Sequence, residues 1–369
     1  MKRKYFLVIA ALTISMALDS TLRAVANVFF FGSIGLLGLM PLSKAIKTGR
    51  IITSPRSGAI VVMMILIIAK DVILISTGSS FTALDLTTQL ACLLLSVVLF
   101  TSVCSHNWQY LFKGWSITIY SAGLVLGLFS YYGIDLPIHE NFPAALMAPL
   151  AIFHIYKFCK RAWLGNLAII IAMTMCILTE SRAALACILI ALIFKLFWKI
   201  LGRGGGKYIF ISLFGLGLLA QTFVAIWNDP FSNAALTNRP VLWNFYLEKS
   251  LERPIFGHGP TSSSGSAEAA ARLSSYLDRG VAESYGPQSM YLRYFYESGL
   301  LGLALLAILL VVLPWGGFGS FISAVYLLVS FSESSLIGLP SVFGMPLIFG
   351  LSVAFAEKRR PSEIAGSSP

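Results

Sequence analysis

The chain has 369 residues, of which 57% are hydrophobic and 12% are charged, whereas about a quarter of the residues of a soluble domain are charged. Apolar runs follow one another along most of its length, each about as long as the ~20 residues that a helix needs to cross a bilayer. This composition excludes an ordinary soluble enzyme and predicts an all-α polytopic membrane protein.

The apolar runs predict twelve transmembrane helices and one long polar loop. Nine spans occupy residues 1–227, the loop occupies 228–288, three spans occupy 289–356, and a tail follows at 357–369. The expected spans are 5–18, 24–42, 59–77, 84–104, 114–133, 143–157, 164–180, 183–200, 208–227, 289–312, 315–332 and 338–356.

The distribution of basic residues predicts the orientation. The formal net charge is +11, but Lys and Arg gather in short loops on one side, such as 44–56, 195–207 and 358–360. Cytoplasmic loops carry this excess in membrane proteins. We therefore expect both termini in the cytoplasm, the 228–288 loop outside, the lipid bilayer as a partner, and no nucleic acid.

Two charged residues interrupt the third span. Lys70 and Asp71 are costly inside a membrane and usually face a bundle interior or a partner there; alternatively, Lys70 lies near enough to a span end to snorkel. The five cysteines show no metal-ligand spacing. Residues 202–207 lack the spacing of a phosphate loop and predict a basic cytoplasmic turn. We expect no metal and no cofactor.

Two short helices are expected within the long loop. The first covers about Pro240 to Glu252, with Asn238 in the cap region and Pro254 as the stop signal. The second covers about 266–278 and carries an acidic residue in its first turn.

Two arginines on the outer side are candidates for binding an anion. Arg182 opens a span, and Arg239 opens the first loop helix, where free N–H groups also favour an anion. Guanidinium pairs well with phosphate, so the two together suit a lipid diphosphate. Arg182 paired with Glu180, and a solvated Arg239, are the alternatives. His258 is the clearest outward histidine and a candidate general base, or else a turn residue.

Three motifs stand in a characteristic order. They are Thr179-Glu-Ser-Arg-Ala-Ala184, then Arg239-Pro-Val-Leu-Trp243 with Glu252-Arg-Pro-Ile-Phe-Gly-His-Gly-Pro260, then Gln288-Ser-Met-Tyr-Leu292 leading to Gly299-Leu-Leu-Gly302. Together they resemble the superfamily of O-antigen ligases and Wzy-type polymerases, most closely between residues 182 and 302.

This resemblance implies an inverting, metal-independent glycosyltransferase in the bacterial inner membrane. The donor would be an undecaprenyl-diphosphate-linked glycan, with Arg182 and Arg239 holding the diphosphate on the periplasmic face. A ligase passes the glycan to lipid A–core, and a polymerase passes it to another lipid-linked glycan. We expect a ligase, with the polymerase as the alternative.

One position departs from the pattern of the family. Ligases commonly carry a histidine eleven residues before the first glycine of Gly-x-x-Gly, where this chain has Gln288. An amide can orient a hydroxyl but cannot take its proton at neutral pH. His258 and Glu283 are the candidate bases in its place. An inactive scaffold member, or a transporter of a lipid-linked solute, remains the alternative from another functional class.

Overall fold

The computed structural model describes residues 142–157, 162–227, 236, 238–259, 267–277, 288–312 and 315–331, with single helical positions at 69, 125, 128, 347, 350, 351, 353 and 354. Most of the first five expected spans lie outside these residues, as do Lys70, Asp71, Glu283 and the 357–369 tail.

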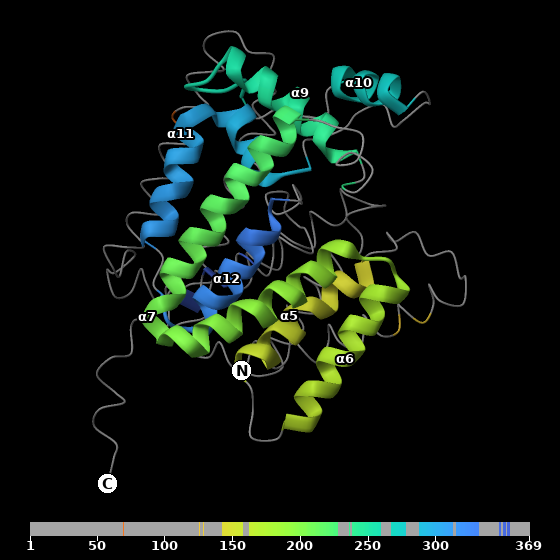
Figure 1. Ribbon diagram of the computed structural model, residues 1–369, viewed down its shortest axis with the longest axis vertical. Helices are drawn as coiled ribbons and strands as arrows, with labels where there is room; N and C mark the ends of the chain where they lie inside the picture. Colours follow the sequence, from red (N-terminus) through yellow and green to blue (C-terminus); the bar gives the residue numbers. More distant parts are fainter. Residues whose placement is uncertain are drawn as a thin grey trace, which may run out of the picture.

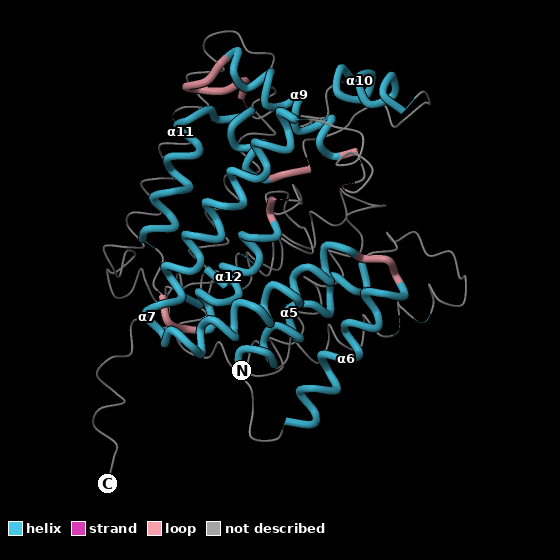
Figure 2. Tube along the Cα trace, in the orientation of Figure 1, coloured by secondary structure: helices cyan, strands magenta, loops and turns pink. Residues whose placement is uncertain are grey.

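All regular structure in the described part of the chain is helical. The helices are α5 (Phe142–Lys157), α6 (Ala162–Leu178), α7 (Arg182–Trp227), α9 (Arg239–Glu252), α10 (Ala267–Leu277), α11 (Met290–Val312) and α12 (Phe318–Val329). Figure 1 shows α9 and α10 together at one end of the molecule and α5 and α6 toward the other, with α7 running between the two ends. Figure 2 shows the described loop segments next to several of these helices.

Most of the expected helices in these ranges are confirmed within a few residues, including both helices of the polar loop. The turn predicted at 202–207 is wrong, because α7 continues through it and joins the expected spans 183–200 and 208–227. A glycine costs a helix about 1 kcal/mol relative to alanine but can still adopt its dihedral angles. Figure 1 shows α7 as two limbs that meet at an angle, as glycine-containing helices often do.

One described segment, Lys207–Trp227, is long and apolar enough to cross a membrane by itself. The helices α5, α6, α7 and α12 share a core that is rich in alanine and aromatic rings. Small residues such as Ala144, Ala148 and Ala151 are fully buried there, which allows helix backbones to approach closely. The twelve-span topology itself stays a prediction.

A break in α11 joins this helix to the segment that follows α9. Gly299 has φ 61° and ψ −159°, so the helical hydrogen-bond ladder is interrupted there. The N–H groups of Leu300 and Leu301 donate instead to the carbonyls of Pro254 and Ile255, at 2.7 and 3.3 Å.

The carbonyls on the other side of this break are paired with the same segment. Tyr296 and Glu297 accept hydrogen bonds from the N–H groups of His258 and Gly259, at 2.7 and 3.0 Å. These are the carbonyls that Leu300 and Leu301 would have used in a continuous helix. Residues 254–259 therefore replace, bond for bond, what the break removes.

Two glycines make this close approach possible. A Cβ on Gly299 would lie 2.3 Å from the carbonyl oxygen of Ile255, and a Cβ on Gly257 would lie 2.5 Å from the backbone of Glu297. Both residues also have a positive φ, at 61° and 71°. Only glycine adopts such angles without steric cost.

We predict that Gly299→Ala lowers the unfolding temperature of the purified protein strongly, or prevents its accumulation, because the Cβ has no space and the φ is unfavourable. The destabilisation should exceed about 3 kcal/mol, beyond the range of most single substitutions. Differential scanning fluorimetry and expression level measure it.

Gly215→Ala is the matched control, since nothing lies within 4 Å of its Cβ position and alanine is the better helix former. It should leave the unfolding temperature unchanged or higher. Equal stability of the two variants would contradict the proposed role of the break.

Candidate active site

Three residues with strained backbones stand at the entrances of three helices. Glu180, Asn238 and Gln288 are the non-glycine residues with positive φ in the described part of the chain, at 51°, 61° and 45°. They precede α7, α9 and α11 by one or two residues. An L-residue in the left-handed region costs about 1–2 kcal/mol, and such strain concentrates at functional sites. The entrances are therefore candidates for function on backbone geometry alone.

The first entrance places Arg182. Helix α6 ends in the left-handed Glu180, with a hydrogen bond of 2.9 Å from the Ser181 N–H back to the Cys176 carbonyl, the arrangement of a Schellman cap. Ser181 is almost fully buried, whereas Arg182, the first residue of α7, is exposed. The tight turn thus fixes the backbone next to an exposed Arg182.

The second entrance places Arg239. Asn238 precedes α9 without making a side-chain capping bond, and Pro240 follows in the first turn. Arg239 is half-buried. Three and four residues farther along the chain, Leu242 and Trp243 are buried against neighbouring helices. The start of α9 is therefore fixed by packing, while its first N–H groups form the positive end of the helix dipole.

The third entrance meets the second. The Nε of Arg239 donates a hydrogen bond of 3.1 Å to the Oε1 of Gln288, across 49 residues of sequence. The amide that stands where ligases commonly carry histidine is thus in contact with one of the two arginines expected to bind diphosphate. The structure brings these two candidate residues together.

A buried polar network holds Gln288 in place from behind. Ser289 is fully buried, and its Oγ accepts from the N–H of Leu292, which caps α11. The same Oγ donates to Gln221 Oε1 at 3.2 Å, and Gln221 Nε2 donates to the Phe331 carbonyl at 2.9 Å. The Met290 N–H donates to the Ser330 carbonyl at 2.9 Å. Helix α7 and the end of α12 therefore fix the entrance of α11.

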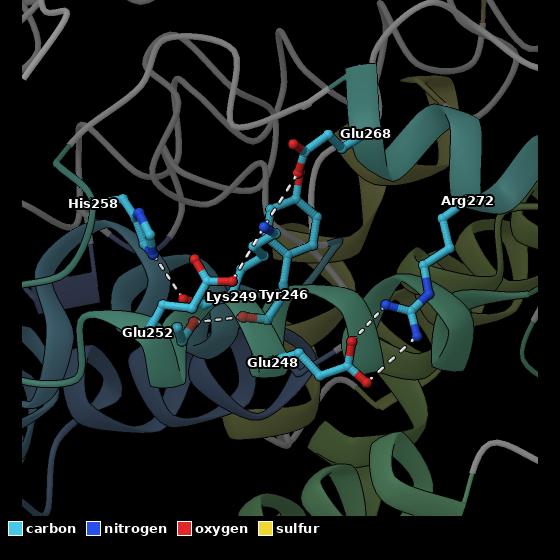
Figure 3. Close-up of polar contacts among 8 residues, drawn as sticks. Tyr246, Glu248, Lys249, Glu252, His258, Glu268 and Arg272 are labelled. Atoms are coloured by element: carbon cyan, nitrogen blue, oxygen red, sulfur yellow. Dashed lines mark hydrogen bonds and ion pairs between the residues drawn. The ribbon is translucent and has the colours of Figure 1, made fainter.

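His258 occupies a well-defined position beside α9. Its Nε2 lies 2.7 Å from the Lys249 carbonyl, and its ring stacks on Tyr296 at 4.7 Å; Figure 3 shows the ring directed at the end of α9. A carbonyl can only accept, so Nε2 carries the proton and Nδ1 is the basic nitrogen. Tyr296 follows Gln288 by eight residues, a rise of about 12 Å along a helix.

Ion pairs attach α10 to α9 on the outer face of this region. Arg272 donates to both Glu248 and Asn244 at 2.6 Å, and Lys249 lies 3.1 and 3.5 Å from Glu252 and Glu268 (Figure 3). Hydrogen bonding to Glu252 and the charges of both carboxylates raise the pKa of Lys249. Exposed pairs of this kind contribute little individually, and the apolar contacts of α9 with α10 supply the rest of the attachment.

A comparison with known proteins finds one family match, which covers the segment from α6 to α11. Residues 167–307 match the family model described as O-antigen ligase. This match confirms the resemblance drawn from the motifs. No curated protein and no solved structure matches the chain. The matched segment runs from α6 to α11 and contains all three helix entrances. It supports glycosyl transfer of the ligase–polymerase kind in a membrane protein.

Several residues of the site were not singled out from the sequence. Gln221 and Ser289 are buried polar residues inside or beside apolar spans, and a polar residue in such a span is itself a signal. Arg293 and Glu297 form a largely buried ion pair of 2.8 Å one turn apart on α11. That Arg182 and Arg239 hold one diphosphate together stays a prediction. Within the described residues, no group of three potential metal ligands occurs.

We predict that Gln221→Leu destabilises the protein by about 1–3 kcal/mol, because the Ser289 hydroxyl and the Phe331 carbonyl lose a buried partner. Thermal unfolding in detergent measures the loss. Thr222→Val is the control, since Thr222 is exposed and its hydroxyl donates to the Leu218 carbonyl of its own helix. A Gln221→Leu protein as stable as the control would show that the network does not fix α11.

Proposed function

We propose that the chain is a glycosyltransferase of the bacterial inner membrane, which moves an undecaprenyl-diphosphate-linked glycan to an acceptor on the periplasmic face. The contact that supports this most is the hydrogen bond between Arg239 and Gln288. It joins the start of α9 to the start of α11 within the segment that matches the O-antigen ligase family. We propose lipid A–core as the acceptor and O-antigen ligation as the activity, with polymerisation as the second candidate.

The proposed chemistry is a single displacement. An acceptor hydroxyl oxygen bonds to the anomeric carbon of the donor while the bond between that carbon and the diphosphate oxygen breaks. The polyprenyl diphosphate leaves with the bonding electrons, and the hydroxyl proton passes to a base. Arg182 and Arg239 would offset the charge that grows on the leaving diphosphate, and the N-terminus of α9 would add its dipole.

Arg182 is exposed and Arg239 is half-buried, and these positions suit two different roles in binding the diphosphate. An arginine that reaches into solvent can collect a diphosphate at the level of lipid headgroups. An arginine held by a neutral partner can then fix its orientation. A transporter would need a path through the molecule, and the features of the three helix entrances give it no specific support.

We predict that deletion of the gene in its native bacterium removes the glycan-capped bands of lipopolysaccharide, and that Arg239→Ala fails to restore them. Arg239→Lys should restore them poorly, because lysine lacks the planar fork. Electrophoresis of the lipopolysaccharide is the measurement. Arg253→Ala, which removes an exposed guanidinium at the opposite end of the same helix, should restore the full pattern.

The band pattern also separates the candidate functions. A single repeat left on the core after deletion would identify a polymerase instead of a ligase. An unchanged pattern would contradict both activities, and full restoration by Arg239→Ala would contradict the assignment of the diphosphate site.

The base is proposed to be His258 or Glu283, with Gln288 orienting the hydroxyl or the leaving group. If His258 is the base, His258→Ala should lower the rate by about 100-fold or more, the scale of general base catalysis. His258→Gln separates this role from a structural one, because an amide N–H can still donate to the Lys249 carbonyl. Turnover of a lipid-linked glycan by the purified variants measures the effect.

Wild-type rates for His258→Gln combined with an unstable His258→Ala would assign His258 to the fold and leave Glu283→Ala as the decisive variant. Full activity of both His258→Gln and Glu283→Ala would exclude both as the base.

A further inference from the structure

We propose that four apolar side chains beside the break in α11 insert among the acyl chains of the outer leaflet of the membrane. Leu251, Ile255, Phe256 and Leu300 are each between 52 and 61% exposed, and together they form what we call the apolar patch. They come from the last turn of α9, from the segment that follows it, and from α11. The inference concerns a contact with lipid and uses none of the residues assigned to the proposed reaction.

Backbone hydrogen bonds hold the apolar patch together as one surface. The N–H of Leu300 donates to the carbonyl of Pro254 at 2.7 Å, so the segment after α9 lies against the second part of α11. The N–H of Gly257 donates to the Arg253 carbonyl at 3.0 Å and closes the turn between them. The exposed apolar side chains therefore extend from a backbone that is fixed on both sides, and not from a loose loop.

The apolar patch continues into an exposed stripe along the rest of α11. Residues 300–312 contain no charged or polar side chain. Among them Leu300, Ala304, Ala307 and Ile308 are exposed, at the spacing i, i+4, i+7 and i+8 of one helix face. This stretch is about 20 Å long as a helix, against about 30 Å for the hydrocarbon core of a bilayer. In a membrane protein, an exposed face of this length and composition meets lipid.

The end of α7 indicates the level of the membrane surface. Lys207–Trp227 is long and apolar enough to cross a membrane, and the charge distribution predicts that Trp227 stands at its outer end. The rings of Phe223 and Trp227 stack at 5.6 Å near this end, and both are exposed. Exposed aromatic rings at the end of an apolar helix are typical of the interface between membrane and water.

Helix α9 lies against α7 at this level. Leu247 of α9 and Val224 of α7 pack against the same cluster, which contains Ala225. Val224 and Ala225 are within one helical turn of Trp227. Leu251 follows Leu247 by four residues and so lies one turn farther along the same face of α9. The apolar patch therefore begins one turn away from a contact at the membrane surface.

The charged side chains at this end of α9 are directed toward a different neighbour. Lys249 lies 3.1 Å from Glu252 and 3.5 Å from Glu268 of α10, as Figure 3 shows. The end of α9 thus has a polar side toward α10 and an apolar side that continues into the stripe of α11. Segments with two such sides lie in the interface, with the apolar side about 5–10 Å deep at the boundary of headgroups and acyl chains. Acyl chains are therefore the occupant that fits the apolar patch.

The test is photo-cross-linking of the full chain in vesicles of phosphatidylethanolamine and phosphatidylglycerol. Phe256→p-benzoylphenylalanine keeps an aromatic ring at an exposed position, so this variant should fold as the wild type does. Irradiation followed by mass spectrometry should find a phospholipid adduct that is attached through an acyl chain. Ile255→p-benzoylphenylalanine is the second position within the apolar patch and should give the same adduct.

Tyr276→p-benzoylphenylalanine is the matched control, since Tyr276 is an exposed aromatic residue on α10; it should give no lipid adduct. Ile308→p-benzoylphenylalanine, on the exposed stripe of α11, should label acyl chains. Absence of lipid adducts at residues 255 and 256 while residue 308 is labelled would overturn the proposal. Cross-links from residues 255 and 256 to a second copy of the chain or to another protein would also overturn it, as would equal lipid labelling at residue 276.

Discussion

The break in α11 at Gly299 is the constraint on which the architecture of this region depends. A helix that loses two ladder hydrogen bonds beside a membrane must replace them, because unpaired backbone groups cost several kcal/mol where water is absent. The segment 254–259 supplies the replacements through its own backbone. That segment directly follows α9, so the position of α9 relative to α11 is set by the need to complete a broken ladder. Arg239 and Gln288 lie near the starts of these two helices, so the same backbone hydrogen bonds determine their relative position.

At the three helix entrances, left-handed residues turn the chain, and packing and hydrogen bonds offset the strain of these residues. Each left-handed residue turns the chain sharply into a helix. Around Gln288 the strain is offset by the buried hydrogen bond from Ser289 to Gln221 and by the hydrogen bond from the Met290 N–H to the Ser330 carbonyl. Around Asn238 it is offset by the packing of Val241, Leu242 and Trp243. The candidate site residues Arg182, Arg239 and Gln288 therefore lie at or beside backbone positions that hydrogen bonds and packing hold in place, an arrangement that suits preorganised electrostatic stabilisation.

Much of this arrangement could be predicted from local sequence signals. Proline at positions 240 and 254 marked both ends of α9, and apolar run length marked α5, α6, α11 and α12. The ordered motifs predicted the family. The break at Gly299 and the Arg239–Gln288 contact could not be predicted, since both depend on pairs of residues 38 or more positions apart. The prediction of a glycine-rich turn at 202–207 was wrong for the opposite reason. Local propensity favoured a turn, but the apolar segments on either side form one helix that continues through it.

Hydrogen bonds to neighbouring helices fix both ends of the segment between residues 259 and 288. Gly259 is bonded to Glu297 at one end, and Gln288 is bonded to Arg239 at the other. The chain between residues 259 and 288 is therefore a connection whose two ends are held in place by hydrogen bonds. Doubling the length of such a connection costs only about 0.6 kcal/mol in closure entropy. The length and sequence of this segment, α10 included, can therefore change at little cost in closure entropy, while the contact between Arg239 and Gln288 is kept.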